Sequence, residues 1–173
     1  WIIIDLWVNF ADDSIPGIDL IMPDPGFIID KKDDLLGIVL THAHEDHIGA
    51  VAHICPELKC KLYATPFTAA LITEKFKEKK IDVSPYLKIV PLNSKIKLGD
   101  FEIDFVTLTH SILEPNGLSI KTPLGTILHT GDWKIDPNPL IGNKIDQEKL
   151  EKIGDAGVSA MICDSTNIFS PGR

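Results

Sequence analysis

The sequence predicts an α+β fold in which short strands and a few helices are interleaved. Three observations lead to this prediction: brief apolar runs bounded by turn residues, two helices with recognisable ends, and two places where neighbouring runs are joined by tight-turn residues. With 173 residues, of which 44% are hydrophobic, the chain is long enough to bury the core of about one domain. We therefore expect layers of strands and helices around a common core.

The strands are expected where apolar residues alternate or form short runs. They are residues 2–6, 19–21, 36–40, 87–90, 95–98, 101–108, 118–121, 126–129 and 160–163. Gly99-Asp100 separates two of these runs and suits the two-residue turn of a β-hairpin. A second hairpin is expected at Thr122-Pro123-Leu124-Gly125, because Pro and Gly supply turn dihedrals and stop the strands. Antiparallel pairing should therefore be substantial.

Two helices have ends that can be recognised in the sequence. Thr65 is expected to cap a helix with Pro66 in its first position, which extends to about Glu78. Asp146 is expected to cap a second helix, which ends at Gly154. A third helix is expected over residues 48–54.

Composition excludes several classes of protein. The hydrophobic content excludes disorder, and no apolar run approaches the roughly 18 residues of a membrane span, so we expect a cytoplasmic protein without a membrane partner. Seventeen basic and 25 acidic residues give a net charge of −8, which repels nucleic acid unless metal ions or another domain supply positive charge. Because the first residue is Trp1 and not Met, we expect a fragment.

The cysteines favour a reducing compartment. Cys55, Cys60 and Cys163 are odd in number and form no C-x-x-C pair, which argues against a disulfide framework. We interpret all three as core thiols. Cys55 and Cys60 could in principle bind a metal, but no second pair accompanies them.

Histidines and carboxylates gather after the strand expected at residues 36–40. The segment Thr41-His42-Ala43-His44-Glu45-Asp46-His47 is an H-x-H-x-D-H arrangement. In an extended segment, residues two apart project to the same side, so His42 and His44 can place two imidazoles on one ion. Asp46 and His47 then turn into a helix start, where they can reach a second ion.

Two more strand ends carry residues of the same kind. His110 follows the strand that ends near Thr109, and Asp132 follows the strand that ends at His129. A lone H-x-H is more often a surface pair, but clustered ligands at three strand ends indicate a metal site. His53 is interpreted as a surface or capping residue. His129 is interpreted as a packed core residue, with support of a ligand as the alternative.

These motifs resemble those of a known family. The segments are Thr41-His42-Ala43-His44-Glu45-Asp46-His47-Ile48-Gly49-Ala50, Thr109-His110-Ser111, Leu128-His129-Thr130-Gly131-Asp132-Trp133-Lys134 and Cys163-Asp164-Ser165-Thr166-Asn167. Together they resemble the metallo-β-lactamase fold and, within it, the ribonuclease J group of β-CASP nucleases. The resemblance implies an αββα sandwich that is incomplete here, chiefly its first half. Residues 1–166 would belong to that domain, and residues 167–173 would begin a β-CASP domain that is absent.

The resemblance also implies a ligand set for two zinc ions, with manganese as a possible substitute. His42, His44 and His110 would bind the first ion, Asp46 and His47 the second, and Asp132 would bridge both. Asp46 would also orient or deprotonate the hydroxide held between the ions, which would attack a phosphodiester. Asp5, Ser111 and Asp164 are candidates for supporting the ligands through hydrogen bonds.

The function implied is that of a zinc-dependent ribonuclease. Such an enzyme would act on RNA as a 5′ exonuclease and an endonuclease in the cytoplasm, in rRNA processing and mRNA decay. The complete protein would form a homo-oligomer through regions absent from this chain. The alternatives are a hydrolase of the same superfamily that acts on a thioester or lactam, and a truncated fragment without catalytic activity.

Two positions depart from the family pattern. Trp7 stands where an Asp-x-Gly turn is expected after Asp5, which predicts altered packing beneath the site. Leu113 replaces the usual Pro after His110-Ser111-Ile112, which predicts a softer loop. A flavodiiron relationship is disfavoured, because that branch usually has Glu where His44 stands.

Overall fold

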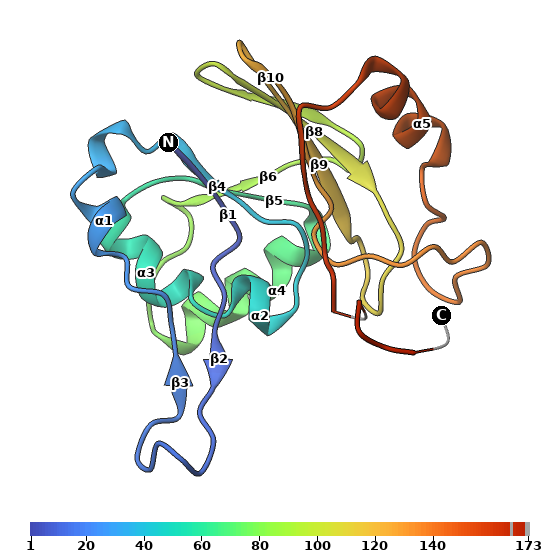
Figure 1. Ribbon diagram of the computed structural model, residues 1–173. Helices are drawn as coiled ribbons and strands as arrows, with labels where there is room; N and C mark the ends of the chain where they lie inside the picture. The colour runs from blue at the N-terminus through green and yellow to red at the C-terminus, as the bar shows by residue number, and fades with distance from the viewer. Residues whose placement is uncertain (167, 172–173) are drawn as a thin grey trace. The chain divides into compact units, whose positions relative to one another are not determined.

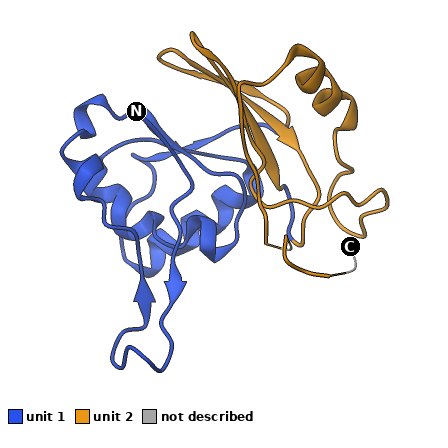
Figure 2. Cartoon of the chain, in the orientation of Figure 1, with its two compact units in different colours: residues 1–92, 112–114 blue, residues 93–111, 115–173 orange. Residues whose placement is uncertain are grey.

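The computed structural model describes residues 1–166 and 168–171, which divide into two compact units. Unit 1 comprises Trp1–Leu92 and Ile112–Glu114, and unit 2 comprises Asn93–Ser111 and Pro115–Arg173 (Figure 2). The expected start of a β-CASP segment at residues 167–173 lies partly outside the described residues. The boundary at residue 166 therefore stays a prediction.

Unit 1 is built on a four-stranded parallel sheet. Its strand order is β1 (Ile2–Ile4), β4 (Gly37–Val39), β5 (Leu62–Ala64) and β6 (Leu87–Ile89) (Figure 1). The residues of β4 are completely apolar and buried, which is typical of a central strand in a parallel sheet. Each strand here is only three residues long, and β5 was missed in the sequence because it lacks a readable pattern.

Along the chain, the helices of unit 1 alternate with these strands. They are α1 (Gly26–Ile29), α2 (Glu45–Ile48), α3 (Val51–Leu58) and α4 (Pro66–Glu78), with a 3-10 turn over Lys32–Asp34. The bounds predicted for α4 are confirmed, since Thr65 is its cap residue and Pro66 its first residue. The helix expected over residues 48–54 is wrong in its bounds, because the chain forms two successive helices, α2 and α3.

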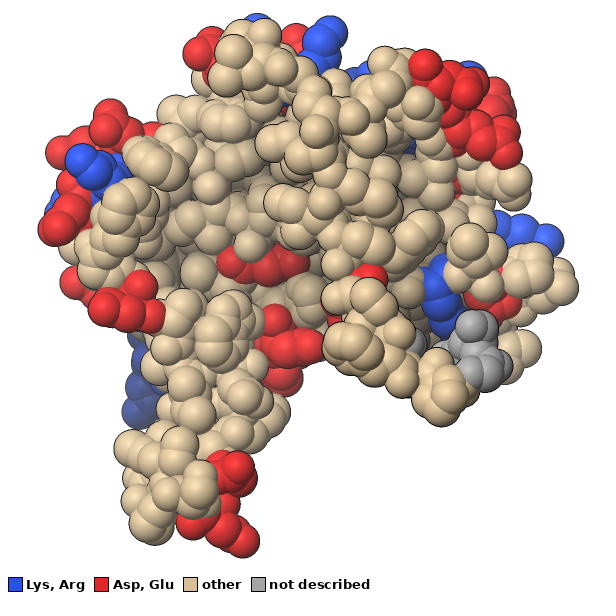
Figure 3. Space-filling model, in the orientation of Figure 1, with Lys and Arg blue, Asp and Glu red and all other residues tan. Residues whose placement is uncertain are grey.

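A short hairpin extends from unit 1. Strands β2 (Asn9–Phe10) and β3 (Leu20–Ile21) pair antiparallel (Figure 1). Phe10 is 64% exposed, and acidic side chains lie at the end of this hairpin (Figure 3). Strand β2 was not predicted, since two residues give no periodicity.

Unit 2 is built on a five-stranded, mainly antiparallel sheet. Its order is β11 (Ala160–Ile162), β10 (Gly125–His129), β9 (Asn116–Thr122), β8 (Phe101–Thr107) and β7 (Lys95–Leu98), with only β10 and β11 parallel. Both predicted hairpins are confirmed: Leu98 pairs with Phe101 around a Gly99 with φ of 56°, and Thr122 pairs with Gly125. The prediction of antiparallel pairing is therefore correct for unit 2, whereas the sheet of unit 1 is parallel.

Helix α5 (Gln147–Ala156) follows in unit 2. The Asp146 carboxylate accepts a hydrogen bond from the backbone N–H of Lys149 at 3.1 Å, so the predicted cap is confirmed. The predicted end at Gly154 is wrong, because the helix continues to Ala156 and Gly157, with φ of 81°, follows it. A cavity of about 180 Å³ lies beside this helix, and its lining includes Leu150, Gly154 and Trp133.

Gly154 is a site where a larger residue should stabilise the fold. A Cβ built at this position meets no atom within 4 Å, and glycine inside a helix is less favourable than alanine. We expect Gly154→Ala to raise the free energy of unfolding by about 0.5–1 kcal/mol, measured by urea denaturation. Gly157→Ala is the control. Its positive φ disfavours a side chain, so this variant should be destabilised, and equal effects of the two substitutions would contradict the argument.

Two of the three cysteines are core thiols, as the sequence predicted. Cys55 and Cys60 are buried, whereas Cys163 is exposed, so its interpretation as a core thiol is wrong. A hydrogen bond with Cys60 and burial raise the pKa of the Cys55 thiol.

Within residues 1–166 and 168–171, no helix is both long enough and apolar enough to cross a bilayer.

Candidate metal centre

The histidine-rich segment of unit 1 follows the buried strand β4. Leu40, Thr41 and His42 are fully buried, and His44 is the cap residue at which helix α2 begins. The backbone of His44 is extended, with φ of −69° and ψ of 153°, so the segment leaves the strand without a turn before α2. This conformation is the one the sequence pattern requires for His42 and His44 to share a side.

His42, His44 and His47 form a cluster of imidazoles. The Nε2 atom of His42 lies 3.1 Å from Nδ1 of His44, and the rings of His42 and His47 have centroids 4.0 Å apart. Two nitrogens bound to one tetrahedral zinc ion at about 2.0–2.1 Å would be separated by about 3.3 Å. The donor set and spacing of His42 and His44 therefore fit a shared metal ion.

The carboxylate of Asp5 organises this cluster. Its Oδ2 atom accepts hydrogen bonds from Nδ1 of His47 at 2.8 Å and from the Thr41 hydroxyl at 2.8 Å, while Oδ1 accepts from the Thr41 backbone N–H at 2.8 Å. The Thr41 hydroxyl is also 3.0 Å from Nδ1 of His42. Because this hydroxyl gives its proton to Asp5, it accepts from His42.

The direction of these bonds determines which imidazole nitrogens are available. Neutral His42 and His47 that donate through Nδ1 keep the lone pair on Nε2, the form in which imidazole binds a metal. One carboxylate thus orients two candidate ligand atoms, that of His47 directly and that of His42 through Thr41. Asp5 was among the supporting residues expected from sequence, and its contacts support that expectation.

Asp5 lies at a sharp change of direction after β1. Its φ is 59°, and its backbone N–H donates to the Val39 carbonyl at 3.0 Å. The side chain of the unusual Trp7 is 43% exposed, whereas its neighbours Leu6 and Val8 are buried at 7% and 4%. The Trp7 ring is thus partly exposed while the residues on either side of it are buried, and the altered packing expected from Trp7 stays a prediction.

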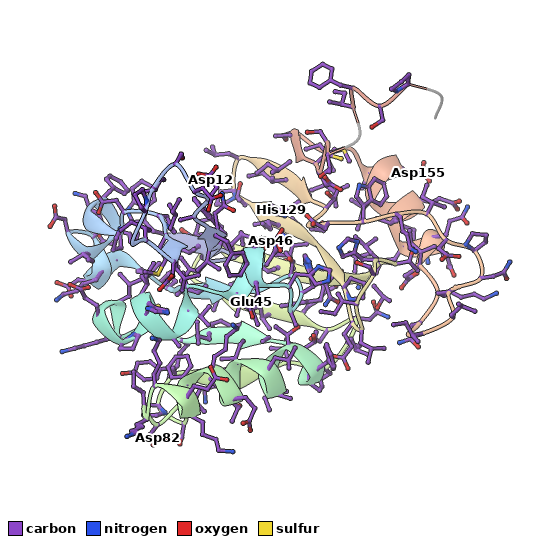
Figure 4. The ribbon with its side chains drawn as sticks, turned by 90° about the horizontal axis from the view of Figure 1, so that it is seen from below. Asp12, Glu45, Asp46, Asp82, His129 and Asp155 are labelled. Atoms are coloured by element: carbon purple, nitrogen blue, oxygen red, sulfur yellow. The ribbon has the colours of Figure 1, made fainter. Side chains whose placement is uncertain are left out.

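The two acidic residues of the motif have different environments. The Asp46 side chain is 65% exposed, and its Oδ2 lies 3.9 Å from Nε2 of His47. The Glu45 carboxylate instead forms an ion pair with Lys75 of α4, with both oxygens within 2.6 Å of Nζ. The two residues lie next to each other at the start of α2 (Figure 4). Both side chains are exposed, and Glu45 is the one that a lysine engages.

Unit 2 brings together His110 and Asp132. Nε2 of His110 lies 3.7 Å from Oδ2 of Asp132, and both side chains are partly buried. The loops that carry them are joined by a bridge between Thr109 and Lys134, in which the Lys134 N–H donates to the Thr109 carbonyl at 2.8 Å. The pairing of these two residues supports the prediction that they act together.

Asp164 lies in the loop after β11. Its carboxylate accepts hydrogen bonds from the Thr166 hydroxyl at 2.6 Å and from the Thr166 backbone N–H at 2.9 Å, and these bonds hold the pKa of Asp164 below its usual value. A smaller contribution comes from the nearby His110. Ser111 is exposed, and its supporting role stays a prediction.

The remaining histidines, His53 and His129, were not predicted to bind metal. His53 is exposed on α3, which agrees with its interpretation as a surface residue. The part of its ring that is removed from water lowers the pKa of His53, and the positive charges of Lys79 and Lys75 lower it further. His129 is half-buried, and its Nδ1 accepts a hydrogen bond from the Gly131 backbone N–H at 3.1 Å. This bond shapes the turn that leads to Asp132.

Sequence reasoning missed the threonines that hold the strand ends. Thr41 links Asp5 to His42, the Thr109 hydroxyl accepts from the Asp136 N–H at 3.2 Å, and the Thr130 hydroxyl accepts from the Asp164 N–H at 3.2 Å. All three are buried. A signal was present, because each threonine directly precedes His42, His110 or Gly131-Asp132.

Comparison with known proteins places this arrangement in a family. The sequence matches the family described as "Beta-lactamase superfamily domain" over residues 1–153. The chain belongs to the β-lactamase superfamily. The α+β fold expected from sequence is confirmed, since the family match and the mixed strands and helices both agree with this superfamily.

The β-lactamase superfamily members that this chain resembles include ribonucleases. Ribonuclease J of Sinorhizobium meliloti is 41% identical over 172 residues, which cover 99% of this chain and 30% of that protein. Ribonuclease J of Corynebacterium glutamicum is 43% identical over 175 residues, which cover 99% of this chain and 24% of that protein. The similarity to ribonuclease J expected from the motifs is confirmed. The chain spans about a quarter to a third of these relatives.

A solved structure agrees with the fold. The crystal structure of a protein of unknown function from Enterococcus faecalis V583 matches with a TM-score of 0.57 at 17% sequence identity, and the match covers 98% of this chain and 46% of that one. At this identity the likeness concerns the fold of the β-lactamase superfamily alone.

Proposed function

We propose that this chain contributes the metal-binding residues of a ribonuclease that hydrolyses RNA phosphodiester bonds. The observation that carries the proposal is the imidazole cluster of His42, His44 and His47, with Asp5 preparing two of its nitrogens, in a chain 41% identical to a ribonuclease J. Metal-dependent hydrolysis is the chemistry that such a donor set suits.

The proposed ligand set draws on both units. His42, His44 and His110 would hold one divalent ion, Asp46 and His47 a second, and Asp132 both. The separations within each unit, 3.1 Å between His42 and His44 and 3.7 Å between His110 and Asp132, support this assignment. We propose zinc as the metal, with manganese as an alternative, because imidazole and carboxylate donors accept either ion.

The chain's own residues then have distinct tasks. When bound, the ions supply Lewis acidity toward water and the phosphodiester. Asp46 is exposed and acceptor-only when ionised, so it can orient a water molecule and take up its proton. Glu45 is engaged by Lys75 and is therefore a poor candidate for that task. Two dications also offset part of the net charge of −8 that disfavours RNA binding.

The finer features of the proposal concern the whole protein. We infer that it acts on RNA as a 5′ exonuclease and an endonuclease, in rRNA processing and mRNA decay in the cytoplasm. A β-CASP segment and assembly into a homo-oligomer would supply the remaining RNA contacts. The similarity to ribonuclease J over 99% of this chain supports these inferences.

Metal content tests the proposal most directly. We expect elemental analysis of the purified chain to find about two zinc ions per chain, and His44→Ala to lose at least one, because a ligand of the first ion is removed. His53→Ala is the matched control, since His53 is exposed and lies outside the cluster; it should retain the metal. Equal metal content in all three proteins would contradict the assignment.

Substrate class is tested with the metal-loaded protein. Release of nucleotides or fragments from single-stranded RNA, absent in His44→Ala, would support the ribonuclease proposal. Hydrolysis of a thioester or a lactam without hydrolysis of RNA would instead identify another activity of the superfamily.

A further inference from the structure

Helix α4 begins with an unusual cap. The side chain of its cap residue, Thr65, accepts no hydrogen bond from a backbone N–H of the first turn, and its hydroxyl instead donates to the Thr68 hydroxyl at 3.5 Å. The backbone N–H of Phe67 donates to Oε2 of Glu114 at 2.8 Å, across 47 residues of sequence. A carboxylate from a distant loop thus satisfies a backbone donor that the first turn leaves open.

Electrostatics favours this contact. The N-terminus of a helix carries partial positive charge, and a carboxylate that accepts a backbone N–H there makes a charge-assisted hydrogen bond. α4 has no acidic residue of its own in its first turn, so Glu114 supplies the negative charge that the helix end favours. Glu114 has φ of 54°, a conformation that non-glycine residues adopt at a cost and retain only when their surroundings hold them.

The loop that carries Glu114 also carries His110. The Leu108 N–H donates to the Pro115 carbonyl at 3.0 Å and closes the base of this loop. Within it, Ile112–Glu114 belongs to unit 1, where Ile112 packs against the hydrophobic core, whereas the residues on either side belong to unit 2. Only Ser111 separates His110 from Ile112, so their Cα atoms are at most about 7 Å apart.

We propose that Glu114 is a positioning residue for His110. By capping α4 it anchors the tip of the loop to unit 1, and the short connection through Ser111 restricts where the His110 imidazole can lie. This inference rests on the proposed function, in which His110 and the histidines of unit 1 share a metal ion.

The test compares metal affinity with stability. We expect Glu114→Ala to weaken zinc binding by about tenfold, measured by competition with a chelator, as for other residues that orient ligands. Glu114→Gln should restore affinity to within about threefold of the unchanged protein, since its amide oxygen can accept the same Phe67 N–H. Glu57→Ala, at an exposed glutamate of α3, is the matched control and should bind zinc normally.

A second measurement separates positioning from stability alone. Amide hydrogen exchange at Phe67 in the metal-free protein should become faster in Glu114→Ala and stay slow in Glu114→Gln. Faster exchange in Glu114→Ala, with zinc affinity unchanged, would overturn the positioning role and leave only a helix cap. Unchanged exchange in that variant would overturn the anchor itself.

His110→Ala distinguishes this proposal from the one it rests on. If His110→Ala weakens zinc binding and Glu114→Ala does not, the positioning role is wrong and the ligand assignment stands. If His110→Ala leaves zinc affinity unchanged, the ligand assignment of His110 fails, and the positioning role fails with it.

Discussion

Asp5→Ala is expected to weaken metal binding by about 10- to 100-fold, the range found when residues that orient metal ligands are removed. The substitution deletes the acceptor of three hydrogen bonds, two from Thr41 and one from His47. The variant thus loses the oxygen that accepts from Nδ1 of His47 and the oxygen that orients the Thr41 hydroxyl relative to His42. Chelator competition against the unchanged protein measures the loss.

The imidazole tautomers give a readout that stability alone does not move. In the metal-free protein, ¹⁵N spectra of the histidine rings should show His42 and His47 protonated on Nδ1, and Asp5→Ala should shift both toward mixtures of tautomers. Thr41→Val is the matched variant. It removes the hydroxyl that links Asp5 to His42 and keeps the Asp5 carboxylate that accepts from His47, so the His47 tautomer should persist while that of His42 changes.

The free energy of unfolding of Asp5→Ala must be measured together with its zinc affinity. The Asp5 side chain is 11% exposed, and each partly buried donor left without an acceptor costs about 1–3 kcal/mol. Urea denaturation of the metal-free variants therefore separates a loss of folding from a loss of binding. A folded Asp5→Ala protein with unchanged zinc affinity and unchanged tautomers would show that the carboxylate does not organise the cluster.

Local signals in the sequence predicted the elements whose ends are determined locally. Thr65-Pro66 predicts the start of α4, and Gly99-Asp100 predicts the hairpin, because a fixed φ or a tight turn needs those residue types. Strands β2 and β5 escaped prediction, since neither forms an apolar run that can be recognised locally, and each becomes a strand only through pairing with distant partners. The parallel sheet of unit 1 escaped for the same reason.

In the candidate site, too, residues close in sequence were predicted and contacts between distant residues were not. His42, His44, Asp46 and His47 lie within six residues, so their spacing alone led to the prediction that they act together on metal ions. The contact between Glu114 and α4 spans 47 residues, and no local pattern indicates it. Cys163 was taken for a core thiol on composition, but exposure depends on what covers β11, whose three residues are all exposed.

The second large effect is expected at Gly49, between α2 and α3. A Cβ at this position would lie 2.2 Å from Cγ2 of Val8 and 2.5 Å from the Glu45 carbonyl oxygen, closer than any real contact. The backbone of Gly49 is right-handed helical, with φ of −59°, so space and not conformation requires glycine here. We expect Gly49→Ala to lower the free energy of unfolding by about 3 kcal/mol, at the upper end of overpacking effects.

We expect this overpacking to disturb the proposed metal ligand His47 as well. Val8 is 4% exposed and cannot move aside without disturbing the segment in which the Leu6 N–H donates to the His47 carbonyl at 2.7 Å. Relief of the clash must therefore shift either this segment or α2, and both routes displace His47 relative to Asp5. Gly49→Ala should accordingly bind zinc more weakly than the unchanged protein even under conditions where it is fully folded.

A double-mutant cycle with Val8→Ala identifies the clash as the cause. Removing the Val8 methyl groups takes away the closest contact, so the double variant should be more stable than the sum of the two single effects predicts, by about 1 kcal/mol or more. Relief is incomplete because the Glu45 carbonyl remains. Strict additivity would show that Gly49 is required for another reason, and the contrast with Gly154, where alanine meets no atom within 4 Å, excludes a general effect of glycine replacement.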